Sequence, residues 1–157
     1  MTTMQRVRIF NQGIVRAPAT NVWEWLTDWA GTRRTRRPVD MGELTLAKIE
    51  LIGEHDRIPR AREMQFGAFG TVRETLLYQN DDAMHLYYNI EGIGPQGVKN
   101  YLATTDVDAI SPASSQVTIT ARFDLDAGAD VVKAKSIIDL AHNHGVIGAL
   151  RRYLESA

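Results

Sequence analysis

Two segments in the second half of the chain alternate regularly between apolar and polar residues. Within residues 115–125 one face carries the apolar side chains Val117, Ile119, Ala121, Phe123 and Leu125. In residues 83–91 the corresponding face carries Met84, Leu86, Tyr88 and Ile90. A period of two places these side chains on one side of a strand and the polar residues on the other. The pattern predicts an antiparallel sheet with one covered face and one face in water.

Clusters of turn-forming residues divide the chain into seven predicted strands. These strands cover residues 5–16, 44–52, 58–66, 70–79, 83–91, 98–108 and 115–125. Gly, Asn, Asp, Pro and Ser gather between them, and such clusters favour turns. We expect the first strand to bend near Gly13, because a glycine inside a strand often marks a bend.

Helical signals lie between the first two strands and again at the end of the chain. A short helix is predicted over residues 21–26, with its N-cap at Thr20 or Asn21, and a second helical turn or loop over 28–38. The final element is a long helix from about Asp130 to Glu155. It is the only element long enough to cover the dry face of the sheet.

The inward stripe of the last helix consists mostly of small residues. Its members are Ala134, Ile138, Ala141, Gly145 and Ala149, with Ile137 and Gly148 beside them. Such a stripe fills little of the space inside a curved sheet, so we expect a pocket between sheet and helix. The alternative is that aromatic side chains of the sheet fill this space, because protein interiors normally pack densely.

These elements predict an α+β fold in which a seven-stranded curved antiparallel sheet wraps round a long C-terminal helix, with two short helices after the first strand. The chain has 157 residues, the usual size of one domain, so residues 1–157 are expected to form a single ligand-binding domain. It is 44% hydrophobic and 24% charged, which is typical of a globular protein.

Composition excludes several classes of function. The chain has no cysteine, which excludes disulfides, thiolate catalysis and zinc–thiolate sites. A net charge of −1 argues against a general nucleic-acid binder, whose phosphate contacts need a basic surplus. No apolar run approaches the ~18 residues of a membrane span, and no apolar leader precedes the first strand. We therefore expect a cytoplasmic protein that contacts neither membrane nor nucleic acid.

The order of strand, two short helices, six strands and long helix resembles the SRPBCC superfamily, which includes START-like lipid carriers, pollen-allergen-like ligand binders and polyketide cyclase/dehydrases. The stretches that carry the resemblance are Val15–Pro18 with Val22-Trp23 and Asp28-Trp29, Gly70–Leu76 preceded by Arg62, Tyr88–Gly92, Asn100-Tyr101 and Val117–Phe123. The resemblance implies a helix-grip fold with a ligand cavity between sheet and helix. It does not imply one reaction, because members include carriers, cyclases, lyases and hydrolases. Members often carry a tryptophan and a proline soon after the second short helix, where this chain has Thr35 and a cluster of arginines.

The hairpin near Ala68 offers an ion pair inside the predicted pocket. If Ala68 is its centre, Arg62 lies opposite Glu74 and Met64 opposite Val72, so the charged pair shares the apolar inner face. An unpaired buried charge is very costly, so the two must satisfy each other. Either they form a bridge that fixes the register of the sheet, or Arg62 anchors a ligand oxygen while Glu74 acts as a base or orienting group.

Three further side chains could take part in chemistry at the pocket. His142 lies at the edge of the inner stripe and could transfer a proton near neutral pH, or it could be a structural histidine. Tyr88 and Tyr101 are expected on the inner face, where a phenol could donate to a carbonyl or enolate oxygen, or simply pack in the core. Asn100 and Thr105 are weaker candidates. The histidine spacing fits no metal motif, so no metal site is expected.

Two other runs have open interpretations. Arg33, Arg34, Arg36 and Arg37 form either a solvated loop or a cluster that gathers a carboxylate, phosphate or acidic carrier protein at the cavity mouth. Residues 92–97 join two strands and are expected to form a hairpin loop that could act as a lid.

These observations lead to two main hypotheses. The first is a cofactor-independent cyclase, dehydratase or lyase for a polyketide-like or aromatic substrate, with Arg62, Glu74, His142 and Tyr88 as catalytic groups. The second is a non-catalytic binding or carrier protein for a hydrophobic ligand, one that could bear an anionic group. A third, weaker alternative is an interaction module without a ligand, and a homodimer is left open. The residues expected to contact ligand are Trp29, Met64, Phe66, Val72, Leu76, Leu86, Tyr101, Ile119, Phe123, Ile138, Ala141 and Gly145.

Overall fold

The computed structural model describes residues 3–36, 39–54, 57–67 and 70–155. The strands are β1 (Gln5–Val15), β2 (Leu46–Ile52), β3 (Arg60–Phe66), β4 (Gly70–Asn80), β5 (His85–Ile90), β6 (Lys99–Ser111) and β7 (Ser114–Leu125). The helices are α1 (Ala19–Thr27), α2 (Thr32–Arg36), α3 (Val131–Leu140) and α4 (Ala149–Leu154), with a π-helical segment η3 (Ala141–Gly148) between the last two. Short 3₁₀ turns, η1 (Gly42–Leu44) and η2 (Pro95–Gly97), precede β2 and β6.

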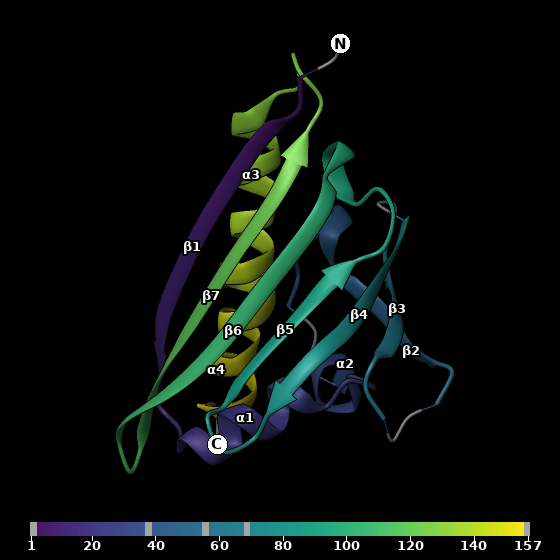
Figure 1. Ribbon diagram of the computed structural model, residues 1–157. Coiled ribbons are helices and arrows are strands. Elements are labelled where there is room, and N and C mark those ends of the chain that lie inside the picture. Colours follow the sequence, from purple (N-terminus) through teal and green to yellow (C-terminus); the bar gives the residue numbers. More distant parts are fainter. Residues whose placement is uncertain (1–2, 37–38, 55–56, 68–69, 156–157) are drawn as a thin grey trace.

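The seven strands form one antiparallel sheet in the order β1-β7-β6-β5-β4-β3-β2. Strands that follow one another from β2 to β7 are neighbours, and β1 joins the sheet at its far edge beside β7. Figure 1 shows α3, η3 and α4 running end to end along one face of this sheet, with α1 and α2 near one end of it. The predicted helix-grip architecture is confirmed.

The predicted alternation along β5 and β7 corresponds to burial. Val117, Ile119, Ala121, Phe123 and Leu125 are all buried under the C-terminal helix. The predicted register of the β3–β4 hairpin is also confirmed, since Arg62 pairs with Glu74 and Met64 pairs with Val72. Ala68, the predicted centre of the hairpin, lies outside the described residues.

Helix α1 begins earlier than the sequence predicts. Its N-cap is Pro18, not Thr20 or Asn21, and no side chain caps the helix. The carbonyl of Pro18 accepts hydrogen bonds from the backbone N–H of Asn21 (3.0 Å) and of Val22 (3.2 Å). The backbone of Pro18 (φ −58°, ψ 144°) therefore supplies a helix start that a side-chain cap was expected to provide.

The C-terminal helix begins next to Asp130, as predicted, but is not uniformly α-helical. Asp130 accepts a hydrogen bond from the backbone N–H of Lys133 at its start. Residues 141–148 then wind as a π-helix, which the sequence did not predict. Segments of π-helix are rare and are found often at functional sites.

Gly13 lets this helix approach β1 closely. A Cβ atom at Gly13 would meet Ile147 Cγ2 at 2.8 Å and Arg151 Nη2 at 3.0 Å. The glycine is thus required by the packing of β1 against the helix. Val15, Val117, Phe123 and Leu150 are fully buried in the core.

Candidate functional site

A cavity lies between the sheet and the C-terminal helix. Its volume is about 120 Å³, and most of its lining is apolar. Ten of the residues expected to contact ligand contribute to its wall, namely Trp29, Met64, Phe66, Val72, Leu86, Tyr101, Ile119, Ile138, Ala141 and Gly145. The four expected catalytic residues, Arg62, Glu74, Tyr88 and His142, also line it. The expectation of an under-filled interior therefore agrees with the structure.

Two expected ligand contacts lie outside the cavity wall. Leu76 is fully buried in the core. Phe123 is also fully buried and stacks behind Tyr101, with their ring centroids 6.4 Å apart. Both side chains lie in the core, behind the residues that form the wall. Alternation along a strand predicts on which side of the sheet a side chain lies, but not whether it reaches the cavity.

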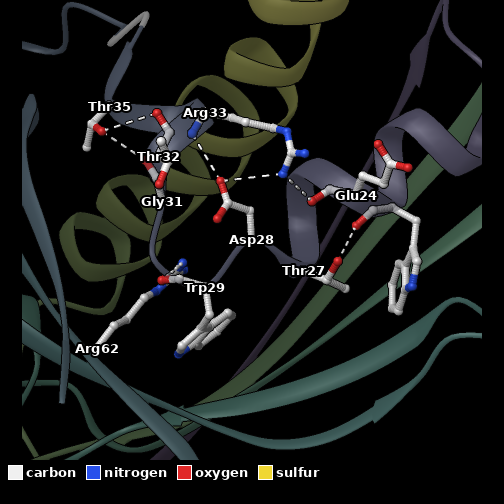
Figure 2. A network of polar contacts seen from close by, with 10 residues as sticks. Glu24, Thr27, Asp28, Trp29, Gly31, Thr32, Arg33, Thr35 and Arg62 are labelled. Carbon is white, nitrogen blue, oxygen red and sulfur yellow. Dashed lines mark hydrogen bonds and ion pairs between the residues drawn. The ribbon is translucent and has the colours of Figure 1, made fainter. Parts of the chain in front are cut away.

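Arg62 and Glu74 form a buried, hydrogen-bonded ion pair. Arg62 Nε and Nη2 both donate to Glu74 Oε1, at 3.0 and 2.7 Å. The remaining terminal nitrogen, Nη1, donates to the carbonyl oxygen of Trp29 at 3.4 Å. The guanidinium also stacks on the Trp29 ring, 3.7 Å from its centroid, and Figure 2 shows the two side chains next to each other. Glu74 Oε2 accepts no hydrogen bond from the residues the structure describes.

A polar cluster behind the cavity fixes the orientation of the Asn11 side chain. Asn11 Nδ2 donates to Asp139 Oδ1 at 3.0 Å, and Asn11 Oδ1 accepts from Asn143 Nδ2 at 2.8 Å. A carboxylate oxygen only accepts, so the amide nitrogen must face Asp139. The same nitrogen lies 3.4 Å from His142 Nδ1, which places a donor beside that ring nitrogen.

This arrangement sets the tautomer of His142. Because Nδ1 faces a donor, the ring proton of a neutral His142 lies on Nε2, 2.7 Å from Tyr101 Oη. Nε2 then donates to Tyr101, and the hydroxyl hydrogen of Tyr101 is free to point to Tyr88 Oη, 3.5 Å away, or into the cavity. If Tyr101 donates to Tyr88, the hydroxyl hydrogen of Tyr88 is free to point into the cavity, so at least one phenol can donate to a ligand.

Burial keeps all three of these groups neutral. His142 is only 3% exposed, and desolvation lowers its pKa to about 4. Desolvation raises the pKa of Tyr88 to about 12, with a further increase from the charge of Glu74. The pKa of Tyr101 is also raised well above 10, mainly by burial. Near pH 7 the cavity therefore holds a neutral imidazole and two neutral phenols beside one ion pair.

The arginine run divides between solvent and cavity. Arg36 is exposed, whereas Arg34 lines the cavity and donates from Nη2 to the carbonyl oxygen of Gly145 at 3.2 Å. Its guanidinium lies 5.7 Å from the centroid of the Trp25 ring. Arg37 lies outside the described residues. The interpretation as a solvated loop is thus wrong for Arg34.

A tight turn before α2 directs Arg34 inward. Asp28 Oδ2 accepts from the backbone N–H of Arg33 at 3.0 Å, and Figure 2 shows this contact beside the start of the helix. Gly31 adopts a positive φ of 69°, and a Cβ there would meet Ile49 Cδ1 at 2.1 Å. Asp28 and the glycine were visible in the sequence as turn signals. The face of a five-residue helix was not, because so short a helix has no measurable period.

Other residues of the wall were missed in the sequence. They are Trp25, Leu26, Val39, Met41, Leu44 and Leu46, together with Pro95 of the loop 92–97. Three of them, Val39, Met41 and Leu44, lie in the connection between α1 and β2, where no periodicity indicates orientation. Thr105, a weaker candidate, is buried in the wall, whereas Asn100 bonds to Asp124 and does not line the cavity.

The other two histidines that the structure describes, His85 and His144, do not line this cavity. His85 contacts Asp106 at 2.6 Å and does not line the cavity, and His55 lies outside the described residues. Within residues 3–36, 39–54, 57–67 and 70–155, no group of three potential ligands could hold a metal ion. In the same ranges no helix is long and apolar enough to span a membrane.

Comparison with known proteins agrees with this architecture. Residues 6–156 match the family described as polyketide cyclase / dehydrase and lipid transport. The chain belongs to this family. Its members are SRPBCC-type helix-grip proteins, and the match covers the sheet, the cavity and the C-terminal helix.

Solved structures show the same fold at low sequence identity. XoxI from Bacillus cereus is similar with a TM-score of 0.75 and 16% identity, covering 96% of each chain. An uncharacterized protein from Bacillus thuringiensis is similar with a TM-score of 0.73 and 17% identity, covering 93% of this chain and 97% of that one. No protein with a curated description matches the chain significantly.

Proposed function

We propose that the protein binds a compact, largely apolar molecule in the cavity and acts on it as a cofactor-independent cyclase, dehydratase or lyase. The observation that carries this proposal is a buried acid–base set inside an apolar cavity. Arg62, Glu74, Tyr88 and His142 all line the same space, together with Tyr101. Perturbed titratable groups that converge on a cavity are typical of active sites.

Glu74 is the proposed base. Both hydrogen bonds from Arg62 end on Oε1, which leaves the lone pairs of Oε2 without a partner among the described residues. Arg62 holds the carboxylate in one orientation, so Oε2 can accept a proton from a carbon or hydroxyl of a bound ligand.

The tyrosines are the proposed electrophilic groups. The Asn11–His142–Tyr101 chain presents hydroxyl hydrogens toward the cavity, where they would stabilise negative charge on a carbonyl or enolate oxygen. His142 acts here through its neutral Nε2–H, since its pKa of about 4 leaves it uncharged near pH 7. Proton abstraction by Glu74 with charge stabilisation by Tyr101 and Tyr88 would support enolisation, cyclisation or elimination.

The volume of the cavity limits the size of the ligand. At about 120 Å³ it is close to the ~150 Å³ of an apolar cavity that accepts benzene, and below the ~300–1,000 Å³ of pockets for drug-sized molecules. The structure therefore favours a ligand about as large as one aromatic ring. A polyketide-like chain would require the wall between α1 and β2 to move outward.

A carrier without turnover is the second candidate. It is favoured by the self-sufficiency of the Arg62 guanidinium, which is satisfied by Glu74 and Trp29 and needs no ligand oxygen. A structural bridge of this kind would leave the cavity free for a hydrophobic cargo.

Native mass spectrometry of freshly purified protein, followed by analysis of the released molecule, tests the proposal. We expect a co-purified small molecule that the wild-type protein converts to product on incubation. Glu74→Gln should retain binding and lose conversion, whereas Glu63→Gln, on the neighbouring register position outside the cavity, should retain both. A ligand that remains unchanged in the wild type would support the carrier, and full conversion by Glu74→Gln would remove Glu74 from the mechanism.

A further inference from the structure

Arg34 is a cation in the cavity wall that has no anionic partner among the described residues. Its one hydrogen bond to the described residues goes to the carbonyl oxygen of Gly145, and no carboxylate among them lies within ion-pair distance. The other charges of the wall are compensated. Glu74 pairs with Arg62, and Asp28 pairs with Arg33 at 3.7 Å. One positive charge in the wall is therefore left over.

The position of Arg34 is unfavourable for an isolated cation. Its pKa is lowered to about 10, chiefly by burial and next by the charge of Arg62. The group stays protonated near pH 7, so a half-buried side chain carries a positive charge close to a second guanidinium. An anion that entered the cavity would offset part of this cost, because a paired charge is less costly to bury than an unpaired one.

We propose that the ligand of this cavity is a compact carboxylic acid whose carboxylate binds Arg34. The guanidinium fork matches the two oxygens of a carboxylate, and the largely apolar lining matches the rest of such a molecule. The volume of about 120 Å³ restricts that remainder to about one ring. This inference rests on the proposed function, since it names the ligand of the same site.

The carboxylate also places the rest of the ligand. Arg34 approaches the helix at Gly145, in the π-helical segment that also carries His142. A ligand held there extends into a space that Glu74 and Tyr88 also line. The negative charge of Glu74 acts on Arg34 across this space. Arg34 would then bind the acid while Glu74 faces its reactive carbon or hydroxyl.

Paired acids and amides test this inference. Benzoate and benzamide have the same ring and almost the same size but differ in charge, and toluene carries no polar group. Binding of each is measured by NMR titration or calorimetry at pH 7. We expect wild type to bind benzoate at least roughly ten-fold more tightly than benzamide, as charge-assisted hydrogen bonds imply. Arg34→Gln should abolish this preference, Arg34→Lys should retain part of it, and the exposed neighbour Arg36→Gln should leave it unchanged.

The outcomes separate the two proposals. If toluene binds but benzoate binds no better than benzamide, the cavity is a ligand site and the carboxylate inference is overturned. If Arg34→Gln still prefers benzoate to benzamide, a group other than Arg34 binds the carboxylate, and the inference is again overturned. If no probe binds, both this inference and the proposed function are overturned.

Discussion

At the scale of single residues, Arg62 and Glu74 form a buried ion pair in which each charge depends on the other. Arg62→Met leaves the Glu74 carboxylate buried without its partner, at a residue only 9% exposed. Removing one member of a buried pair costs about 3–5 kcal/mol. We expect a loss of that size in the free energy of unfolding, measured by urea denaturation.

The adjacent register position supplies the control for this variant. Arg73 pairs with Glu63 at 2.9 Å on the outer side of the same hairpin, where water screens the charges. Arg73→Met should change stability far less than Arg62→Met. The double variant Arg62→Met/Glu74→Leu should recover most of the loss, because an apolar pair leaves no buried charge. A small cost for Arg62→Met alone would contradict a buried, unhydrated pair.

His142 makes stability depend on pH below neutrality. Its pKa is about 4 in the folded protein, against 6.5 without the fold, so the unfolded chain binds a proton first as the pH falls. Stability should therefore decrease from about pH 6.5 down to about pH 4, by about 3 kcal/mol in total from this residue. Above pH 6.5 both states are neutral at this position and the contribution is constant.

Carboxylates titrate in the same range, so the His142 contribution is obtained as a difference. Urea unfolding at pH 7, 6 and 5 should show a steeper decrease for wild type than for His142→Gln. His144→Gln, two residues along at an exposed position, should retain the wild-type slope. Equal slopes in wild type and His142→Gln would show that the imidazole is hydrated.

At the scale of elements, the C-terminal helix has two kinds of small residue on one face. Ala134 is 1% exposed and packs in the core, whereas Ala141 lines the cavity. Ala134→Leu forces extra atoms into a filled space and should cost about 1–3 kcal/mol. Ala141→Leu projects its extra atoms into empty space, so it should retain stability and block the binding of ring-sized ligands. Thermal unfolding and toluene titration measure both effects, and equal destabilisation by the two variants would contradict an empty cavity.

The elements differ in how far the sequence predicts them. The β3–β4 register could be predicted because a hairpin pairs residues that are close in the chain, and apolar Met64 and Val72 mark its inner face. The π-helical winding of residues 141–148 could not, because it depends on packing against β1 and α2. The side of α2 that carries Arg34 could not be predicted either, because a five-residue helix is too short to show a period.

At the scale of the whole molecule, the sequence predicts the architecture and the existence of a cavity, but not its volume. Periodicity assigns Leu76 and Phe123 to the inner face, yet only the curvature of the sheet decides that they lie behind the wall. The residues between α1 and β2 close one side of the cavity without any pattern that shows their direction. The volume of the cavity is thus determined by the tertiary structure and not by local sequence patterns.

The position of β1 has a consequence for synthesis on the ribosome. β1 is made first, but it pairs only with β7, whose residues lie 100 to 120 positions later, from Val15↔Ser115 to Gln5↔Leu125. At about 5–20 residues per second, the nascent β1 waits on the order of 5–20 s for its partner. During this interval its backbone edges and apolar side chains are open to chaperones and to other nascent chains. The β2–β7 meander, by contrast, can pair hairpin by hairpin as it emerges.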